Sequence, residues 1–216
     1  KTYILNIMNE EALIGLFATP LYKSRVDVDP SINEDYLKSL PYFNFPDGTG
    51  ACSRDQQILL NSKFESLKKE IDKHVNLYLY GALKIAQGKP KHIQSWITLH
   101  KADQASPKHL HSNSFISGGV YFECPPDCGR LNFAQTKNNP SWHTGTIVPQ
   151  VSENNLFNSD MVGFDVERGD IFIFPSHLLH STGSNRSGKD RYMVAFNYFL
   201  EGTIGRETGE ISLRVS

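Results

Sequence analysis

The sequence predicts a mainly β protein, built as a sandwich or closed jelly roll, with a helical layer in its N-terminal part. From residue 93 onward, short apolar runs alternate with Gly, Pro, Asn and Asp, which is typical of many short strands joined by turns. One long helical pattern lies before this region. The length of 216 residues suits a single all-β domain with a sizeable core.

The first elements are expected to be short. Leu16 to Tyr22 reads as an early strand, and Pro20 favours a position at a sheet edge because proline has no backbone donor. Ile32 to Leu40 reads as a short helix between two turn-rich segments.

A longer helix is predicted from about Ser62 to Leu83. Ser62 and Glu65 match the capping pattern Ser-x-x-Glu, and apolar residues recur at helical spacing behind them. His74 lies beside this apolar stripe, so we interpret it as a packing or surface histidine. Gly88 and Pro90 end the element.

Seven strands are expected after this helix. They are Ile93 to His100, Ile116 to Cys124, Arg130 to Ala134, Gly145 to Val148, Met161 to Val166, Asp170 to Phe174 and Arg191 to Leu200. The polar segment from Thr136 to Asn158 is a long loop, and such loops are often functional. We therefore expect one domain over residues 1–216, with an N-terminal layer over 1–92 and a β core over 93–216.

Charge and cysteine content restrict the function and the compartment. Lys and Arg total 22 and Asp and Glu total 23, a net charge of −1 that does not favour nucleic acid or an acidic membrane as partner. No apolar run approaches the roughly 20 residues of a membrane helix. The N-terminus lacks a signal-peptide pattern, and the three cysteines have no framework spacing, so we expect a cytoplasmic protein.

His109 and His111 form the strongest chemical signal. On a strand, side chains two residues apart point to the same face, so both imidazoles can reach one metal ion. Imidazole pairs bind Fe, Zn, Cu or Ni, and the spacing alone does not choose the metal. Two exposed strand histidines are the plain structural alternative.

A third imidazole is expected from His180. It follows a predicted buried strand, Asp170 to Phe174, at the point where a jelly roll returns the chain beside His109. His177 competes for this role. His143 and His100 are not expected to be ligands, although His100 can face the same cavity from a neighbouring strand.

Arg191 opens a strand whose alternation places Arg191, Met193, Ala195 and Asn197 on one face. A buried guanidinium requires a partner, and a carboxylate matches it in a bidentate manner. This favours an anion site, whereas an ion pair with Asp170 or Asp190 is the structural alternative. The rival cation, Arg186, lies in a turn and is expected to be solvated.

These features resemble the 2-oxoglutarate/Fe(II)-dependent dioxygenase superfamily, in particular its bacterial and phage branch of uncharacterised oxygenases. The matching segments are Leu16 to Pro20, Ser95-Trp96, His109 to His111 leading to Ser117 to Phe122, and Phe174-Pro175 through His180 and Arg191 to Asn197. The resemblance implies a double-stranded β-helix, a cupin-like jelly roll with N-terminal helices packed on one face. It also implies Fe(II), 2-oxoglutarate and dioxygen as the reacting set, with a peptidyl or small-molecule substrate.

Carried over to this chain, the resemblance makes His109 and His180 iron ligands and Arg191 the clamp for the distal carboxylate of 2-oxoglutarate. Asn197 would line the co-substrate pocket. Val120 and Phe122 would face inward on the partner strand. Some relatives have a tyrosine hydroxyl at the position of Phe122, so that hydrogen bond is in question.

The larger departure is the second ligand. The usual triad is two histidines and one carboxylate, and here the carboxylate position falls on His111. A three-histidine site is therefore expected, with Asn113 in the carboxylate position or a contribution from Asp103 as alternatives. Substrate is expected to enter past Thr136 to Asn158 and Phe43 to Cys52.

Two other readings remain. A metal-binding cupin enzyme of another class uses strand histidines without 2-oxoglutarate, and a non-catalytic jelly-roll protein holds metal for stability alone. Cys124 and Cys128 are interpreted as free thiols in a turn, because two cysteines without partner cysteines are a weak zinc signal.

Overall fold

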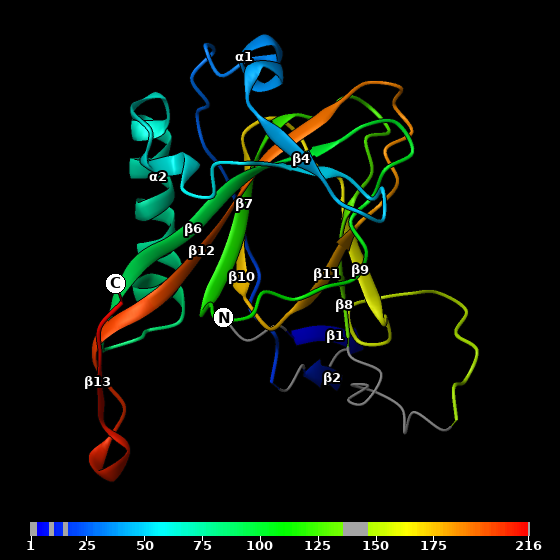
Figure 1. The fold of residues 1–216 in the computed structure, drawn as a ribbon. Helices are drawn as coiled ribbons and strands as arrows, with labels where there is room; N and C mark the ends of the chain where they lie inside the picture. The colour runs from blue at the N-terminus through cyan, green and yellow to red at the C-terminus, as the bar shows by residue number, and fades with distance from the viewer. Residues whose placement is uncertain (1–3, 9–10, 15–16, 136–146, 216) are drawn as a thin grey trace.

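The computed structural model describes residues 4–8, 11–14, 17–135 and 147–215. Its main sheet has the strand order β3-β10-β7-β12-β6-β5-β4, with β13 paired to β12, and a smaller sheet has the order β11-β8-β9. Figure 1 shows the two sheets facing each other and helix α2 lying against the outside of the main sheet. The fold is mainly β, a double-stranded β-helix, as predicted.

Six of the seven predicted core strands are present in the predicted order, and β11 and β13 are additional strands that were not predicted. The core strands are β6 (Lys89–His100), β7 (Ile116–Glu123), β8 (Leu131–Ala134), β9 (Met161–Phe164), β10 (Asp170–Pro175), β11 (Leu179–Thr182), β12 (Arg191–Ile204) and β13 (Ile211–Leu213). The expected strand at 145–148 lies partly outside the described residues, and 147–148 are not in a strand.

The N-terminal part contains more strands than the sequence indicated. It comprises β1 (Ile4–Met8), β2 (Glu11–Ile14), β3 (Tyr22–Arg25), α1 (Glu34–Ser39), β4 (Tyr42–Asn44), β5 (Ala51–Ser53) and α2 (Glu65–Asn76). The expected strand at 16–22 is wrong over residues 17–21, which are irregular, and the real strand β3 begins where that range ended. It does lie at the edge of the main sheet.

The long helix covers the predicted range but begins differently. Residues 62–64 form a 3-10 turn, α2 follows, and a π-helical segment covers Leu77–Ala82. The predicted capping box does not form, because Phe64 occupies the N-cap and no side chain caps the helix. Glu65 instead pairs with Lys69, four residues later. His74 is buried and bonded to the Tyr22 hydroxyl at 2.7 Å, in agreement with a packing role.

The large apolar core lies between the helical layer and the outer face of the main sheet. Phe64, Leu67 and Ile71 from the helical layer meet strand residues such as Val120 and Phe196 there. A second cluster, including Tyr121 and Phe172, lies between the two sheets. The two clusters occupy opposite faces of the same strands, so one face stabilises the fold while the other faces the space between the sheets. No described helix is long and apolar enough to cross a membrane.

Candidate metal centre

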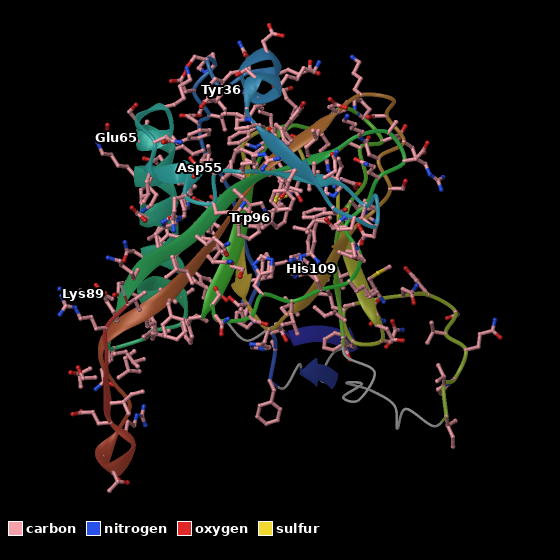
Figure 2. The ribbon with its side chains drawn as sticks, in the orientation of Figure 1. Tyr36, Asp55, Glu65, Lys89, Trp96 and His109 are labelled. Atoms are coloured by element: carbon pink, nitrogen blue, oxygen red, sulfur yellow. The ribbon has the colours of Figure 1, made fainter. Side chains whose placement is uncertain are left out.

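The three predicted histidines converge between the two sheets. His109 forms an isolated β-bridge with His180, in which each backbone N–H donates to the other residue's carbonyl oxygen at 2.9 and 3.0 Å. The backbone N–H of His111 donates to Ser176 at 3.0 Å, so the 109–111 segment runs beside the 176–180 segment. Spacing by two residues places His109 and His111 on the same side. Figure 2 shows His109, with Trp96 near it, in this interior space.

Each imidazole is oriented by a hydrogen bond from its Nδ1 atom. His109 Nδ1 contacts the Pro107 carbonyl at 2.8 Å and His180 Nδ1 the Leu178 carbonyl at 2.9 Å. His111 Nδ1 contacts Asn197 Oδ1 at 2.6 Å. Because these partners are acceptors, Nδ1 carries the proton and Nε2 is left with a lone pair for a ligand.

The chemistry of this histidine cluster fits a metal ion. One nitrogen from each of the three rings lies within 4.8 Å of the others. Burial lowers the pKa of His111, and burial together with nearby His109 lowers the pKa of His180 to about 3. Both rings are therefore neutral at pH 7, which is the protonation state that binds metal.

The alternative ligands lie elsewhere. Asn113 and Asp103 are exposed and adopt left-handed backbone conformations, with φ of 57° and 64°. His177 is exposed, and His143 lies outside the described residues. Over the described parts of the chain, no carboxylate belongs to the group of close ligand atoms.

Arg191 is fully buried and its guanidinium is only partly engaged. Nη1 donates to the carbonyl oxygens of Cys128 and Gly129 at 2.8 and 3.1 Å, and Nη2 contacts His100 Nδ1 at 2.7 Å. Nε has no hydrogen-bond partner among the described residues. Of five guanidinium N–H groups, Nε–H and one Nη2–H remain available, a number that suits one carboxylate.

The structural alternative for Arg191 does not occur among the described residues. Asp170 pairs with Lys23 and Arg25, and Asp190 accepts a hydrogen bond from Tyr192. Arg186 is exposed, as expected for a turn residue.

Tyr121 of β7 faces the site, and the prediction for this strand was wrong. Val120 and Phe122 were expected to face the site, but both belong to the outer core against the helical layer, where Phe122 packs against Phe64. Tyr121 faces the space between the sheets, and its buried hydroxyl has no hydrogen-bond partner among the described residues. Burial raises the pKa of Tyr121, so this hydroxyl remains a donor at neutral pH. The inward-facing residue of β7 with a phenolic hydroxyl group is therefore Tyr121, one residue before the expected position.

A cavity of about 790 Å³ is lined by the three histidines, Tyr121 and Asn197, and Arg191 lies behind its lining, in contact with His100. The inner faces of β6 and β12 form one wall, and its lining residues are His100, Thr98, Trp96, Gln94, Met193, Ala195 and Asn197. In the register of the two strands, Arg191 is the partner of His100 on the same face as Met193, Ala195 and Asn197. The alternation predicted for β12 is therefore correct. Residues of the 43–52 segment also line the cavity, whereas residues 147–158, the described part of the other segment on the predicted entry route, do not.

Asn197 lines the cavity and contacts the candidate metal ligand His111. Its Oδ1 accepts from His111 at 2.6 Å and from the Ser117 hydroxyl at 2.7 Å. Sequence reasoning did not single out Gln94 and Gln56, which also line the cavity. Side chains two residues apart on a strand share a face, and Gln94 lies two residues before Trp96 in β6. This spacing could have identified Gln94 from the sequence.

Comparisons with known proteins agree with this geometry. Residues 94–197 match the family described as "Putative 2OG-Fe(II) oxygenase", a range that contains all the site residues predicted from the sequence. No curated protein matches the chain in sequence.

Three solved structures illustrate the likeness. The epimerase SnoN, in complex with Fe3+, alpha ketoglutarate and nogalamycin RO, has a TM-score of 0.57 at 13% identity, covering 88% of this chain and 83% of that one. A Pseudomonas putida prolyl-4-hydroxylase has a TM-score of 0.55 at 11% identity, covering 85% and 94%. HygX from Streptomyces hygroscopicus, with nickel, 2-oxoglutarate and hygromycin B bound, has a TM-score of 0.53 at 13% identity, covering 83% and 82%.

At such low identities these likenesses show the fold, while the family model matches the sequence itself. Residues 94–197 thus match the sequence model of the putative 2OG-Fe(II) oxygenase family, and the chain has the double-stranded β-helix of the solved structures it is similar to.

Proposed function

We propose that this protein is a non-haem Fe(II)- and 2-oxoglutarate-dependent dioxygenase that hydroxylates an unactivated carbon of a peptidyl or small-molecule substrate. His109, His111 and His180 hold the iron, and Arg191 binds the distal carboxylate of 2-oxoglutarate. The supporting observation is one cavity lined by the three histidines and the unpaired Tyr121 hydroxyl, with the partly unpaired guanidinium of Arg191 directly behind the lining residue His100.

The three imidazoles suit iron, but the loaded site would carry more positive charge than one with a carboxylate ligand. Imidazole nitrogens are good ligands for Fe(II), as they are for Zn, Cu and Ni. Replacing the usual carboxylate by His111 leaves the full charge of the metal uncompensated by the protein. This favours anionic co-ligands, and 2-oxoglutarate is a dianion.

The protein's residues bind, orient and exclude water. When bound, the iron centre uses dioxygen and 2-oxoglutarate to oxidise a substrate C–H bond, with succinate and CO2 as co-products. Arg191 and Tyr121 fix the far end of the co-substrate, so its keto-acid end is directed toward the histidines. Apolar side chains such as Phe174 and Met193 line the cavity and reduce access of water.

The compartment follows from the cysteines. Cys52, Cys124 and Cys128 are all free thiols. Because intracellular reductants keep thiols reduced, we propose a cytoplasmic enzyme.

The test is co-substrate binding and turnover. Purified protein loaded with Fe(II) should release succinate from 2-oxoglutarate, slowly without substrate. Arg191→Met should lower 2-oxoglutarate affinity by about 100-fold, because a buried charged partner is lost. Arg186→Met, which changes an exposed arginine, is the control. Full 2-oxoglutarate affinity in Arg191→Met would contradict the assignment.

A cupin-type metal enzyme that does not use 2-oxoglutarate is the second candidate. The observation that favours it is the all-histidine donor set, which lacks the family's usual carboxylate. Such an enzyme has no need of Arg191. Metal-loaded protein that binds no 2-oxoglutarate would therefore select this alternative.

A further inference from the structure

The cavity wall made by β6 and β12 has two chemically different ends. Arg191 lies opposite His100 at one end, and Asn197 lies opposite Gln94 at the other. Asn197 lies six positions after Arg191 along the strand, a span of about 20 Å. The Arg191 end suits the co-substrate carboxylate, so the Asn197 end is left for another ligand.

A directed chain of amides occupies this second end. Asn197 Oδ1 accepts from His111 and Ser117, which turns its Nδ2 toward Gln94 Oε1 at 3.4 Å. Gln94 Nε2 donates to Gln56 Oε1 at 3.1 Å, and Gln56 Nε2 donates to the Ser53 carbonyl at 2.7 Å. The orientation of each amide is therefore set by its neighbour, starting from the candidate metal ligand His111.

Gln94 retains hydrogen-bonding capacity on the cavity side. A primary amide has two N–H donors and two acceptor lone pairs. Gln94 uses one donor toward Gln56 and accepts one long contact from Asn197. One N–H and one lone pair remain on the same side chain, which is the complement of the C=O and N–H of another amide.

The surroundings of Gln94 select against charge. Trp96 lies two residues along the same strand face, with its ring 5.6 Å from that of His111, and Phe43 and Phe45 line the cavity from the neighbouring hairpin. No lysine or arginine lines the cavity among the described residues. The one lining carboxylate, Asp47, already accepts hydrogen bonds from the Thr49 backbone and hydroxyl.

We propose that Gln94 determines substrate specificity by pairing through two hydrogen bonds with a carboxamide group of an uncharged substrate, whose apolar part packs on Trp96. The substrate class is thus a peptide or a small carboxamide. This inference rests on the proposed function, because it assumes that the substrate approaches the metal from the side of His111 and Trp96.

The experiment compares benzamide with methyl benzoate, which keeps the ring and the carbonyl group, is one methyl group larger and lacks the N–H donor. Binding of each probe to protein loaded with Zn(II) and 2-oxoglutarate is measured by ligand-observed NMR titration, which requires no turnover. Benzamide should bind at least about tenfold more tightly than the ester, because a site built to pair with an N–H group rejects the analogue without it. N-acetylphenylalanine methylamide, measured in parallel, distinguishes a peptide substrate from a small carboxamide. If it binds more tightly than benzamide, the substrate is a peptide, and if it binds more weakly, the substrate is a small carboxamide.

Two variants test the role of Gln94. Gln94→Leu should lower benzamide affinity at least about tenfold and leave the affinity for methyl benzoate and 2-oxoglutarate unchanged. Gln94→Glu, which keeps an acceptor and loses the donor, should also lose the preference for the amide. The exposed Gln150→Leu is the matched control and should bind as the unchanged protein does.

The outcomes separate this inference from the proposed function. If Zn(II) and 2-oxoglutarate bind but the two probes bind equally, or if Gln94→Leu keeps the amide preference, the Gln94 assignment is wrong and the oxygenase proposal stands. If 2-oxoglutarate does not bind the unchanged protein, the oxygenase proposal fails first and the inference fails with it.

Discussion

The outer and inner faces of β6, β7 and β12 are made of alternate residues of the same strands, yet they differ in chemistry. The outer face is closely packed, and Ile97, Val120, Phe122 and Val194 have no exposed surface. The inner face carries Trp96, Tyr121, Met193, Asn197 and other side chains around a cavity. The outer face therefore supplies stability, and the inner face can keep polar groups unpaired because the other side holds the sheet in place.

The largest effect on stability is expected when the packing of the outer face is disrupted. Phe122→Ala removes a fully buried ring that packs against Phe64. Cavity formation should lower the free energy of unfolding by about 3–5 kcal/mol, measured by denaturant titration. Zn(II) affinity, measured well below the melting temperature, should stay within threefold of the unchanged protein, roughly 0.6 kcal/mol. Loss of metal binding in a still-folded variant would show that the two faces are not separable.

Adjacent glycines of β7 allow a sharper comparison. A Cβ at Gly118 would meet the backbone oxygen of Phe172 and the ring of Phe196. One at Gly119 would meet the flexible end of Met193 and lie 3.1 Å from the Val194 carbonyl oxygen, a milder contact. Gly118→Ala should therefore destabilise by about 1–3 kcal/mol. Gly119→Ala should cost less, because Met193 can move into the cavity. Thermal melting of both variants checks the order, and the reverse order would contradict the assignment of the faces.

The inner face can be altered without breaking the fold. Asn197→Ala removes the acceptor that orients His111, so Zn(II) affinity should fall by about 10–100-fold in chelator competition. Asn197→Asp retains an oxygen acceptor and should restore most of that affinity. If Asn197→Asp binds metal as weakly as Asn197→Ala, the contact with His111 does not position the ring.

The smallest effect concerns His92, whose ring packs against Tyr198. Burial, assisted by the positive charge of Lys68, lowers the pKa of His92 to about 4. Between the unfolded value of 6.5 and about 4, the unfolded chain binds a proton that the folded chain does not, so this residue lowers stability as pH falls. His92→Gln should lose fewer degrees of melting temperature between pH 7 and pH 4.5 than the unchanged protein. An equal loss in both proteins would contradict the assignment.

Much of the site could be predicted because strand alternation is local. The spacing of His109 and His111, and the shared face of Arg191 and Asn197, depend only on the two-residue period of a strand. The inward face of β7 could not be predicted in this way. Residues 116–122 are buried on both sides of the sheet, so no contrast between polar and apolar residues marks the inner face.

Two of the wrong predictions in the N-terminal part, the missed strands β4 and β5 and the capping box, also result from contacts made in the folded chain. Residues 42–44 and 51–53 are too short to show a period, and they form strands because β5 pairs with the edge of β6. The capping box predicted from Ser62 and Glu65 does not form, because residues 62–64 adopt a 3-10 turn and Glu65 pairs with Lys69. In both cases contacts made by the folded chain override the local preference.

The sequence by itself determined the mainly β class, the three histidines and the face that carries Arg191, because these follow from residue type and local periodicity. Only the tertiary structure decided that Tyr121 and not Phe122 faces the cavity, that Asn197 holds His111, and that Gln94 and Gln56 continue that contact along the wall. These choices depend on which side of a doubly buried sheet each neighbouring element covers, and residues far apart in the chain set that arrangement.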